Sequence, residues 1–300
     1  MRLKADLTLL IVTIIWGSAF VAQRVAGQMG SVYLFNAARY LLAALAVLPL
    51  ALRVGKIPAS SPKIPLDQYK WMLIAGFLLF IGSALQQVGV VYTTAGNAGF
   101  ITGLYAVLVP IALFVVWREK PHWVSIVAVG LAGVGAFLLS TGGRFEVRAG
   151  DILVLISTLF WTFHVIVLGK YASRFEAMTF SVGQLFICGI LNFVLGIFVE
   201  PFPPFDWALI GAIAYTAFFS LALAYTLQIW AQRHTPPTDA ALLLSLESVF
   251  AVLSGWFFLD ERLALIQVAG CVLIFIAVLL SQFKEWTSGR MDHDHLVEGR

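Results

Sequence analysis

The chain has 300 residues, of which 60% are hydrophobic and only 12% are charged, whereas a soluble domain carries about 25% charged residues. A soluble fold of this size would lack enough polar surface to cover itself, so the composition excludes an ordinary soluble domain. The net charge of +3 is small and spread over loops without interleaved aromatic residues, which excludes a nucleic-acid-binding surface.

The apolar stretches last about 20 residues, the length of a helix that crosses the roughly 30 Å hydrocarbon core of a bilayer. They are too long for the roughly 10-residue alternating strands of a membrane barrel. The sequence therefore predicts an all-α membrane protein with ten transmembrane helices, in chain order Leu7–Ala26, Val32–Leu52, Trp71–Tyr92, Ala95–Trp117, Val124–Leu139, Ile152–Tyr171, Ala177–Phe198, Trp207–Ala231, Thr238–Leu259 and Leu263–Ser281.

The loop charges predict the orientation of these helices. Lysine and arginine favour the cytoplasmic side of short loops, and a cytoplasmic N-terminus places fourteen of the 19 there and four on the opposite side. We therefore expect a multi-pass protein of the cell membrane with both termini in the cytoplasm and residues 284–300 as a polar cytoplasmic tail.

Self-comparison reveals an internal repeat. Asp6 stands ten residues before Trp16, and Asp151 stands ten residues before Trp161. Later in each half, Asn97-Ala98 aligns with Asp239-Ala240, and Tyr105 aligns with Glu247. Weak internal symmetry of this kind marks many transporter folds.

Each repeat contains five predicted helices, an odd number, so the second copy must enter the membrane in the opposite orientation. The sequence thus predicts two inverted five-helix repeats, residues 1–145 and 146–283. Such an arrangement has two near-equivalent packings, and a site at the interface of the halves faces either side in turn. Gene duplication without transport is the alternative interpretation of the repeat.

The chain resembles the ten-helix drug/metabolite transporter superfamily, specifically its EamA-domain permeases. The resemblance covers the chain to about Ser281 and rests on three features: Trp16-Gly17-Ser18-Ala19-Phe20, Leu246-Glu247-Ser248-Val249-Phe250-Ala251, and Glu119 and Glu261 at the ends of the fourth and ninth helices. Ser248 stands where the family often has proline, so the resemblance predicts no proline kink there.

This resemblance implies alternating access through a central cavity, lined by the first to fourth and sixth to ninth helices, with the fifth and tenth more peripheral. Substrates of the family include amino acids, nucleobases, other metabolites and drugs.

Three ionisable residues, Arg39, His164 and Glu247, lie away from the ends of the predicted helices and so inside the bilayer, where such groups usually face a bundle interior or a water-filled path. Glu247 is interpreted either as a group that binds a cation or exchanges a proton, or as a structural carboxylate paired with Arg39. His164 is interpreted as a proton-coupling group or as a neutral histidine bonded between helices. Arg39 is an interior anchor that could also hold an acidic substrate.

Aromatic and amide side chains complete the predicted site. Trp16 and Trp161 fall at mid-span rather than in the interfacial belts that tryptophan prefers, and with Tyr105 they predict an aromatic wall that accepts amphipathic or cationic solutes. Plain helix packing is the alternative. Gln87 and Tyr225, with the further polar residues Gln86, Asn97 and Gln228, are expected either in the cavity or between helices. Pro110 predicts a flexible joint in the fourth helix.

These features predict a secondary transporter, an exporter of amino acids, nucleobases or drug-like solutes, rather than an enzyme. Its expected partners are a small-molecule substrate, the lipid bilayer, and a coupling proton or exchanged solute. A membrane enzyme acting on a lipid or peptide and a non-transporting scaffold are the alternatives, but the sequence has no HExxH, Gly-x-Ser-x-Gly or P-loop motif. No cofactor, metal or nucleic acid is expected, since His293 and His295 lie in the polar tail, and nothing indicates an oligomeric state.

Overall fold

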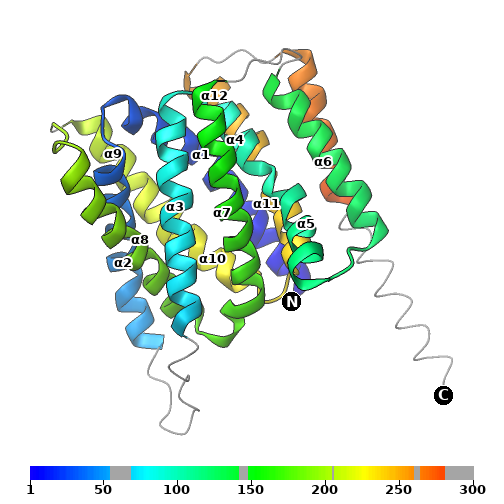
Figure 1. The fold of residues 1–300 in the computed structure, drawn as a ribbon, viewed down its shortest axis with the longest axis horizontal. Coiled ribbons are helices and arrows are strands. Elements are labelled where there is room, and N and C mark those ends of the chain that lie inside the picture. The colour runs from blue at the N-terminus through cyan, green and yellow to red at the C-terminus, as the bar shows by residue number, and fades with distance from the viewer. Residues whose placement is uncertain (55–68, 142–147, 205, 260–263, 281–300) are drawn as a thin grey trace, which may run out of the picture.

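The computed structural model describes residues 1–54, 69–141, 148–204, 206–259 and 264–280, and the regular elements within these ranges are all helical (Figure 1). The residues predicted as a cytoplasmic tail, 284–300, lie outside them. The elements are α1 (Arg2–Gln28), α2 (Tyr33–Val54), α3 (Lys70–Val91), α4 (Ala95–Gly103), α5 (Tyr105–Trp117), α6 (Trp123–Thr141), α7 (Ala149–Tyr171), η2 (Ala172–Arg174), α8 (Ala177–Val199), α9 (Trp207–Tyr215), η3 (Thr216–Leu223), α10 (Ala224–Ala231), α11 (Pro237–Leu244) and α12 (Glu247–Leu259).

Eight helical stretches in the described residues are long and apolar enough to cross a membrane. Three of them join consecutive elements: Ala95–Trp117 joins α4 and α5, Trp207–Ala231 joins α9, η3 and α10, and Pro237–Phe258 joins α11 and α12. Two shorter apolar helices, Trp123–Leu139 and Leu265–Leu280, accompany them. The prediction of an all-α, multi-pass membrane protein is confirmed.

The two halves of the chain interlock rather than pack as separate bundles. Helix α1 packs against α9, η3, α10, α11 and α12 of the second half, and α7 packs against α3, α4 and α5 of the first. Helices α2 and α8 pair with each other across the halves. Each half therefore buries its first helix in the other half, and the interior of the molecule is built by both.

The two shorter helices lie together at the side of the bundle, where Figure 1 shows α6 apart from α2 and α8. Their backbones approach closely at two glycines: a Cβ on Gly135 would lie 2.7 Å from the carbonyl oxygen of Gly270. Small residues permit such close approach of helices in membranes.

Two of the spans are interrupted near their middle. Leu104 separates α4 from α5, and Ser245 with Leu246 separates α11 from α12, so Tyr105 and Glu247 are the first residues of the second segments. Short-range backbone bonds tighten the chain there, from Val107 N to Leu104 O (2.9 Å) and from Ser248 N to Ser245 O (3.2 Å). Such tight turns within a helix often mark a functional joint.

Pro110 lies within helix α5, which continues past it, and the flexible joint that it predicts stays a prediction. The interruption comes six residues earlier, at Leu104. The second interruption forms without a proline, since Ser245 and Leu246 occupy it. A further irregularity is the π-helical segment η3. Such turns are rare in proteins, and those that occur are often at functional sites.

Candidate functional site

A narrow cavity lies between the two halves at mid-span. Residues of α1, α2, α3, α4 and α5 line it from the first half, and residues of α7, η3, α10 and α12 line it from the second. About 50 Å³ of it is open to the centre of a water molecule, and one water needs roughly 10–15 Å³ on that measure. In this conformation the cavity thus holds a few waters or part of a small solute.

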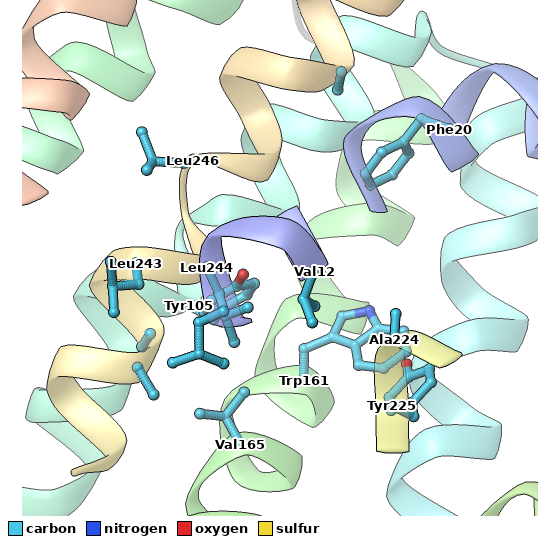
Figure 2. Packing of buried hydrophobic residues seen from close by; sticks show 14 of the residues in the cluster. Val12, Phe20, Tyr105, Trp161, Val165, Ala224, Tyr225, Leu243, Leu244 and Leu246 are labelled. Atoms are coloured by element: carbon cyan, nitrogen blue, oxygen red, sulfur yellow. The ribbon is translucent and has the colours of Figure 1, made fainter. Parts of the chain in front are cut away.

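Seven of the eight residues predicted for the site line this cavity: Trp16, Arg39, Tyr105, Trp161, His164, Tyr225 and Glu247. Figure 2 shows Tyr105, Trp161 and Tyr225, from α5, α7 and α10, among the packed apolar side chains of the interior. The fifth predicted helix, the tenth and α8 contribute no lining residue within the described ranges.

Gln87, the eighth predicted residue, lies outside the cavity. Its Nε2 donates to the backbone oxygen of Gln23 over 2.8 Å, which ties α3 to α1. The neighbouring Gln86 lines the cavity instead and donates to the Thr102 hydroxyl over 2.8 Å. Consecutive helical residues point about 100° apart, and the sequence does not say which of the two glutamines faces inward.

The Trp16-Gly17-Ser18 motif of α1 makes three different contacts. Trp16 Nε1 donates to the backbone oxygen of Ser220 in η3 over 2.8 Å. A Cβ on Gly17 would lie 2.7 Å from the carbonyl oxygen of Glu247, so this glycine lets α1 approach α12. The Ser18 hydroxyl lies 2.5 Å from the Tyr215 hydroxyl. The motif thus joins α1 to α9, η3 and α12 of the second half.

Aromatic rings form one wall of the cavity. The rings of Trp16 and Tyr225 lie 5.0 Å apart, and the ring of His164 meets both Tyr225 (5.8 Å) and Trp161 (5.9 Å) edge to face. Unlike Trp16, Trp161 has no hydrogen-bond partner for its buried Nε1. The two symmetric tryptophans therefore differ: Trp16 is bonded to the backbone, whereas the Nε1–H of Trp161 remains free to donate to a group in the cavity.

Arg39 is buried and held by neutral groups. Its Nε donates to Asn36 Oδ1 over 3.0 Å, its Nη2 lies 3.5 Å from Gln23 Oε1, and its guanidinium lies over the rings of Phe35 and Tyr40 at 4.9 and 5.2 Å. Among the ion pairs of the described residues Arg39 has no carboxylate partner. Its positive charge is thus oriented but not neutralised by an acidic side chain.

His164 has a protein partner. Its Nε2 lies 2.9 Å from Gln184 Oε1 of α8, and both side chains are buried. This bond between helices is the arrangement that the structural interpretation of His164 expects, and its ring still contributes to the cavity wall.

Glu247 and Tyr105 stand at the two helix interruptions and face the same cavity. Glu247 is only 3% exposed, and its carboxyl and the buried Tyr105 hydroxyl face each other closely enough to interact, although neither Glu247 Oε1 nor the Tyr105 hydroxyl makes a hydrogen bond of normal geometry. The ion pair between Glu247 and Arg39 that the structural interpretation invoked is absent from the described residues. The cavity thus presents a positive group on α2 and a carboxyl on α12 that do not bond to each other.

A family model matches the chain twice. The model of the EamA-like transporter family matches residues 3–141 and again residues 148–283. The chain belongs to the EamA-like transporter family. The resemblance drawn from the sequence motifs is confirmed, and a transport role in a membrane goes with this membership.

Two of three relatives of this EamA-like chain are named as transporters, and the third is named as a WAT1-related protein. An uncharacterized transporter of Archaeoglobus fulgidus is 34% identical over 93% of this chain and 86% of its own length. The uncharacterized transporter YvbV of Bacillus subtilis is 24% identical over 94% and 93%, and a WAT1-related chloroplastic protein of Arabidopsis thaliana is 22% identical over 90% and 67%.

A crystal structure of another protein has the same fold as this EamA-like chain. The two superpose with a TM-score of 0.73 over 94% of this chain and 98% of the other, at 16% identity. That level of identity establishes the fold alone.

At one end of the EamA-like bundle, α1 is tied to the segment between α10 and α11. The Thr235 hydroxyl donates to Asp6 Oδ1 over 2.9 Å. Arg2 pairs with Asp6 over 3.2 Å and with Asp239 over 2.9 Å. The start of the first half is thus fastened to the second half.

The equivalent tie exists for the second half. The Thr93 hydroxyl, between α3 and α4, donates to Asp151 Oδ1 of α7 over 2.5 Å. Thr93 stands four residues before Asn97 as Thr235 stands four before Asp239, and Asp151 is the repeat counterpart of Asp6. We call these two contacts the Thr235–Asp6 tie and the Thr93–Asp151 tie.

The two ties lie at opposite ends of the bundle. Gly27, at the end of α1, contacts Val91, two residues before Thr93, whereas Asp6 is near the start of α1. Twenty-one residues of helix separate Asp6 from Gly27, or about 30 Å at 1.5 Å per residue. The cavity therefore lies between a tie at one end and its counterpart at the other.

No group of three or more histidine, cysteine, aspartate or glutamate side chains in the described ranges could hold a metal ion. His293 and His295 lie outside those ranges.

Proposed function

We propose that this protein is a secondary transporter that exports small polar metabolites by alternating access. The observation that carries the proposal is the cavity that both halves line, in which the buried Nε1 of Trp161 and both amide atoms of Gln228 lack protein partners. Leaving a buried polar atom unpaired costs about 1–3 kcal/mol. A solute that pairs with these atoms recovers that energy, which is the behaviour expected of a binding site rather than of a structural core.

The proposal includes ten spans arranged as two inverted five-helix repeats, residues 1–145 and 146–283. Three observations support it: the family model matches twice, each half buries its first helix in the other, and both the fourth and the ninth predicted helices are interrupted just before Tyr105 and Glu247. Discontinuous helices at a repeat interface are frequent at transporter binding sites.

Alternating access would proceed by opening one tie at a time. Releasing the Thr235–Asp6 tie separates α1 from the segment before α11 and widens the cavity toward one side, whereas releasing the Thr93–Asp151 tie widens it toward the other. The loop charges support an orientation in which the Thr235–Asp6 end and both termini face the cytoplasm.

The lining favours polar cargo, amino acids or nucleobases, over an apolar drug-like solute. Arg39 would hold an anionic or electron-rich group of the solute, and Glu247 would hold a cationic group or exchange a proton. The aromatic wall of Trp16, Trp161 and Tyr225 would contact the rest of the solute.

Growth protection tests the proposal. Cells that overproduce the protein are challenged with toxic amino-acid analogues, nucleobase analogues and cationic drugs, alongside cells that produce Glu247→Gln at an equal level. We expect protection against one polar class by the wild-type protein and its loss in the variant, because glutamine keeps the shape of Glu247 but cannot be charged.

Two controls make the result decisive. Membrane fractions and size-exclusion profiles show whether the variant is inserted and folded. Asp206→Asn, at the exposed start of α9 and away from the cavity, should keep protection, because asparagine caps a helix as well as aspartate does. If folded wild-type protein protects against none of the compounds, the export proposal fails, and uptake of the same compounds by whole cells is then measured.

A further inference from the structure

Gln228 differs from the other buried glutamines of the described residues. Gln23, Gln86, Gln87, Gln184 and Gln232 each use at least one side-chain amide atom in a hydrogen bond. Gln228 is 1% exposed, lines the cavity, and has no partner for either Oε1 or Nε2. The amide group has no partner in either of its two possible orientations, because both its oxygen and its nitrogen are unpaired.

Gln228 faces the cavity and forms no hydrogen bond with a neighbouring helix in the described part of the chain. It follows Tyr225 by three residues on α10 and therefore shares a face with that ring, which contacts Trp16. Gln232, one turn further along the same helix, donates instead to the backbone oxygen of Val165 over 3.1 Å. The helix thus uses one glutamine for packing and leaves the other for the cavity.

A primary amide offers a donor and an acceptor side by side in one plane. A carboxylate in the solute would satisfy only the Gln228 nitrogen, and an ammonium or guanidinium group only its oxygen. A group that itself carries an N–H beside a C=O satisfies both atoms at once. Paired bonds of this kind are how glutamine reads an adenine edge in nucleic acids.

We propose, on the basis of the export function above, that Gln228 selects solutes that carry a carboxamide-type edge, an N–H donor adjacent to a C=O acceptor. This class comprises primary amides and the lactam edges of nucleobases. The unpaired Nε1 of Trp161 and Oε1 of Glu247 in the same cavity supply one further donor and one further acceptor for the remainder of such a solute.

Binding of matched probes to the purified full-length protein in lipid nanodiscs tests this inference. L-Asparagine is paired with L-leucine, which has nearly the same shape without the amide, and uracil is paired with 1,3-dimethyluracil, which keeps the carbonyls but has no N–H. We expect the amide member of at least one pair to bind at least about tenfold more tightly, because each hydrogen bond to a buried neutral group is worth up to about tenfold in affinity.

Variants of Gln228 and Gln232 show which residue produces the preference for the amide member of each pair. Gln228→Met keeps the length of the side chain and should reduce the preference to less than about twofold, and Gln228→Asn should retain part of it. Gln232→Met, on the same helix, should keep the full preference. If Gln228→Met is not folded, comparing the preference of Gln228→Asn with that of Gln232→Met shows whether the preference depends on Gln228.

Equal binding of both members of each pair, an unchanged preference in the Gln228 variants, or no binding of any probe by folded wild-type protein would overturn the inference. The export function is judged separately. Growth protection by the wild-type protein against a compound without a carboxamide-type edge would retain export and refute the role of Gln228, whereas tight amide binding without protection would retain the role of Gln228 and refute export.

Discussion

At the scale of single residues, the cavity is lined both by polar side chains that have hydrogen-bond partners in the protein and by polar side chains that have none. Trp16, His164 and Gln86 have protein partners, whereas Trp161 and Gln228 keep unpaired polar atoms. The first group fixes the walls, and the second is available to a solute. A substitution in one group should therefore change stability, and a substitution in the other should change recognition.

The symmetric tryptophans allow a direct comparison of these groups. Trp16→Phe removes the bond to the Ser220 carbonyl and should lower the free energy of unfolding by about 0.5–2 kcal/mol, the range for hydrogen bonds within membrane proteins. Trp161→Phe removes an Nε1 without a partner and should cost less stability while weakening transport by about tenfold. Thermal unfolding in detergent and transport into proteoliposomes measure the two effects, and an equal loss of stability in both variants would contradict the assignment.

The candidate site was predictable in part because an intramembrane charge or a mid-span tryptophan is costly or unusual enough to indicate a cavity. That argument located Arg39, Glu247 and the two tryptophans. It did not distinguish Gln86 from Gln87, because two adjacent polar residues on one helix carry no information about its rotation. Which polar atoms stay unpaired depends on neighbours far away in the chain, and so the distinction of Gln228 from Gln232 needed the structure.

At the scale of the helices, the interruptions before Tyr105 and Glu247 position the two residues at the beginnings of helical segments that face the cavity. The apolar runs predicted where the spans lie, but they did not predict these interruptions. Ser245 and Leu246 are neither glycine nor proline, and only Gly103, directly before Leu104, is a local signal for a break. Next to these interruptions α12 packs against both α1 and α4. The π segment η3 also makes tertiary contacts, including the Trp16 bond.

Gly17 should not tolerate a side chain, because α1 and α12 approach each other closely at this residue. In Gly17→Ala the new Cβ would meet the backbone nitrogen of Ala251 and the carbonyl oxygen of Glu247, both at 2.7 Å. We expect a loss of stability of about 1–3 kcal/mol from overpacking, together with reduced transport because α12 carries Glu247.

Gly130→Ala in α6 is the matched control, since nothing lies within 4 Å of its Cβ position. It should leave stability unchanged or raise it slightly, as alanine favours helix over glycine. Both variants are compared by thermal unfolding and by export from cells, and normal unfolding and export of Gly17→Ala would refute the close-packing argument.

At the scale of the whole molecule, the proposed alternating access predicts that releasing either tie opens the cavity on one side only. Thr235→Val and Thr93→Val each remove a hydroxyl donor while keeping the shape of the side chain. In a protein whose two cysteines are replaced, a cysteine introduced at Ser220 reports on access to the cavity. Thr235→Val should raise its labelling from the Asp6 end by a few-fold, and Thr93→Val should raise it from the opposite end.

The labelling reagent is a maleimide that does not cross membranes, applied to right-side-out and inside-out vesicles. The double variant serves as a control and should be labelled from both sides. Labelling that rises from the same side in both single variants would contradict the assignment of the ties to opposite gates.

The interlocking of the halves also constrains how the molecule is made. Helix α1 leaves the ribosome well before α9 to α12, against which it packs, and at about 5–20 residues per second the interval is roughly ten to forty seconds. During this time Asp6, Trp16 and Ser18 of α1 lack the second-half residues with which they later form hydrogen bonds. A chain that terminates before α9 therefore lacks most of the surface against which α1 packs in the finished protein.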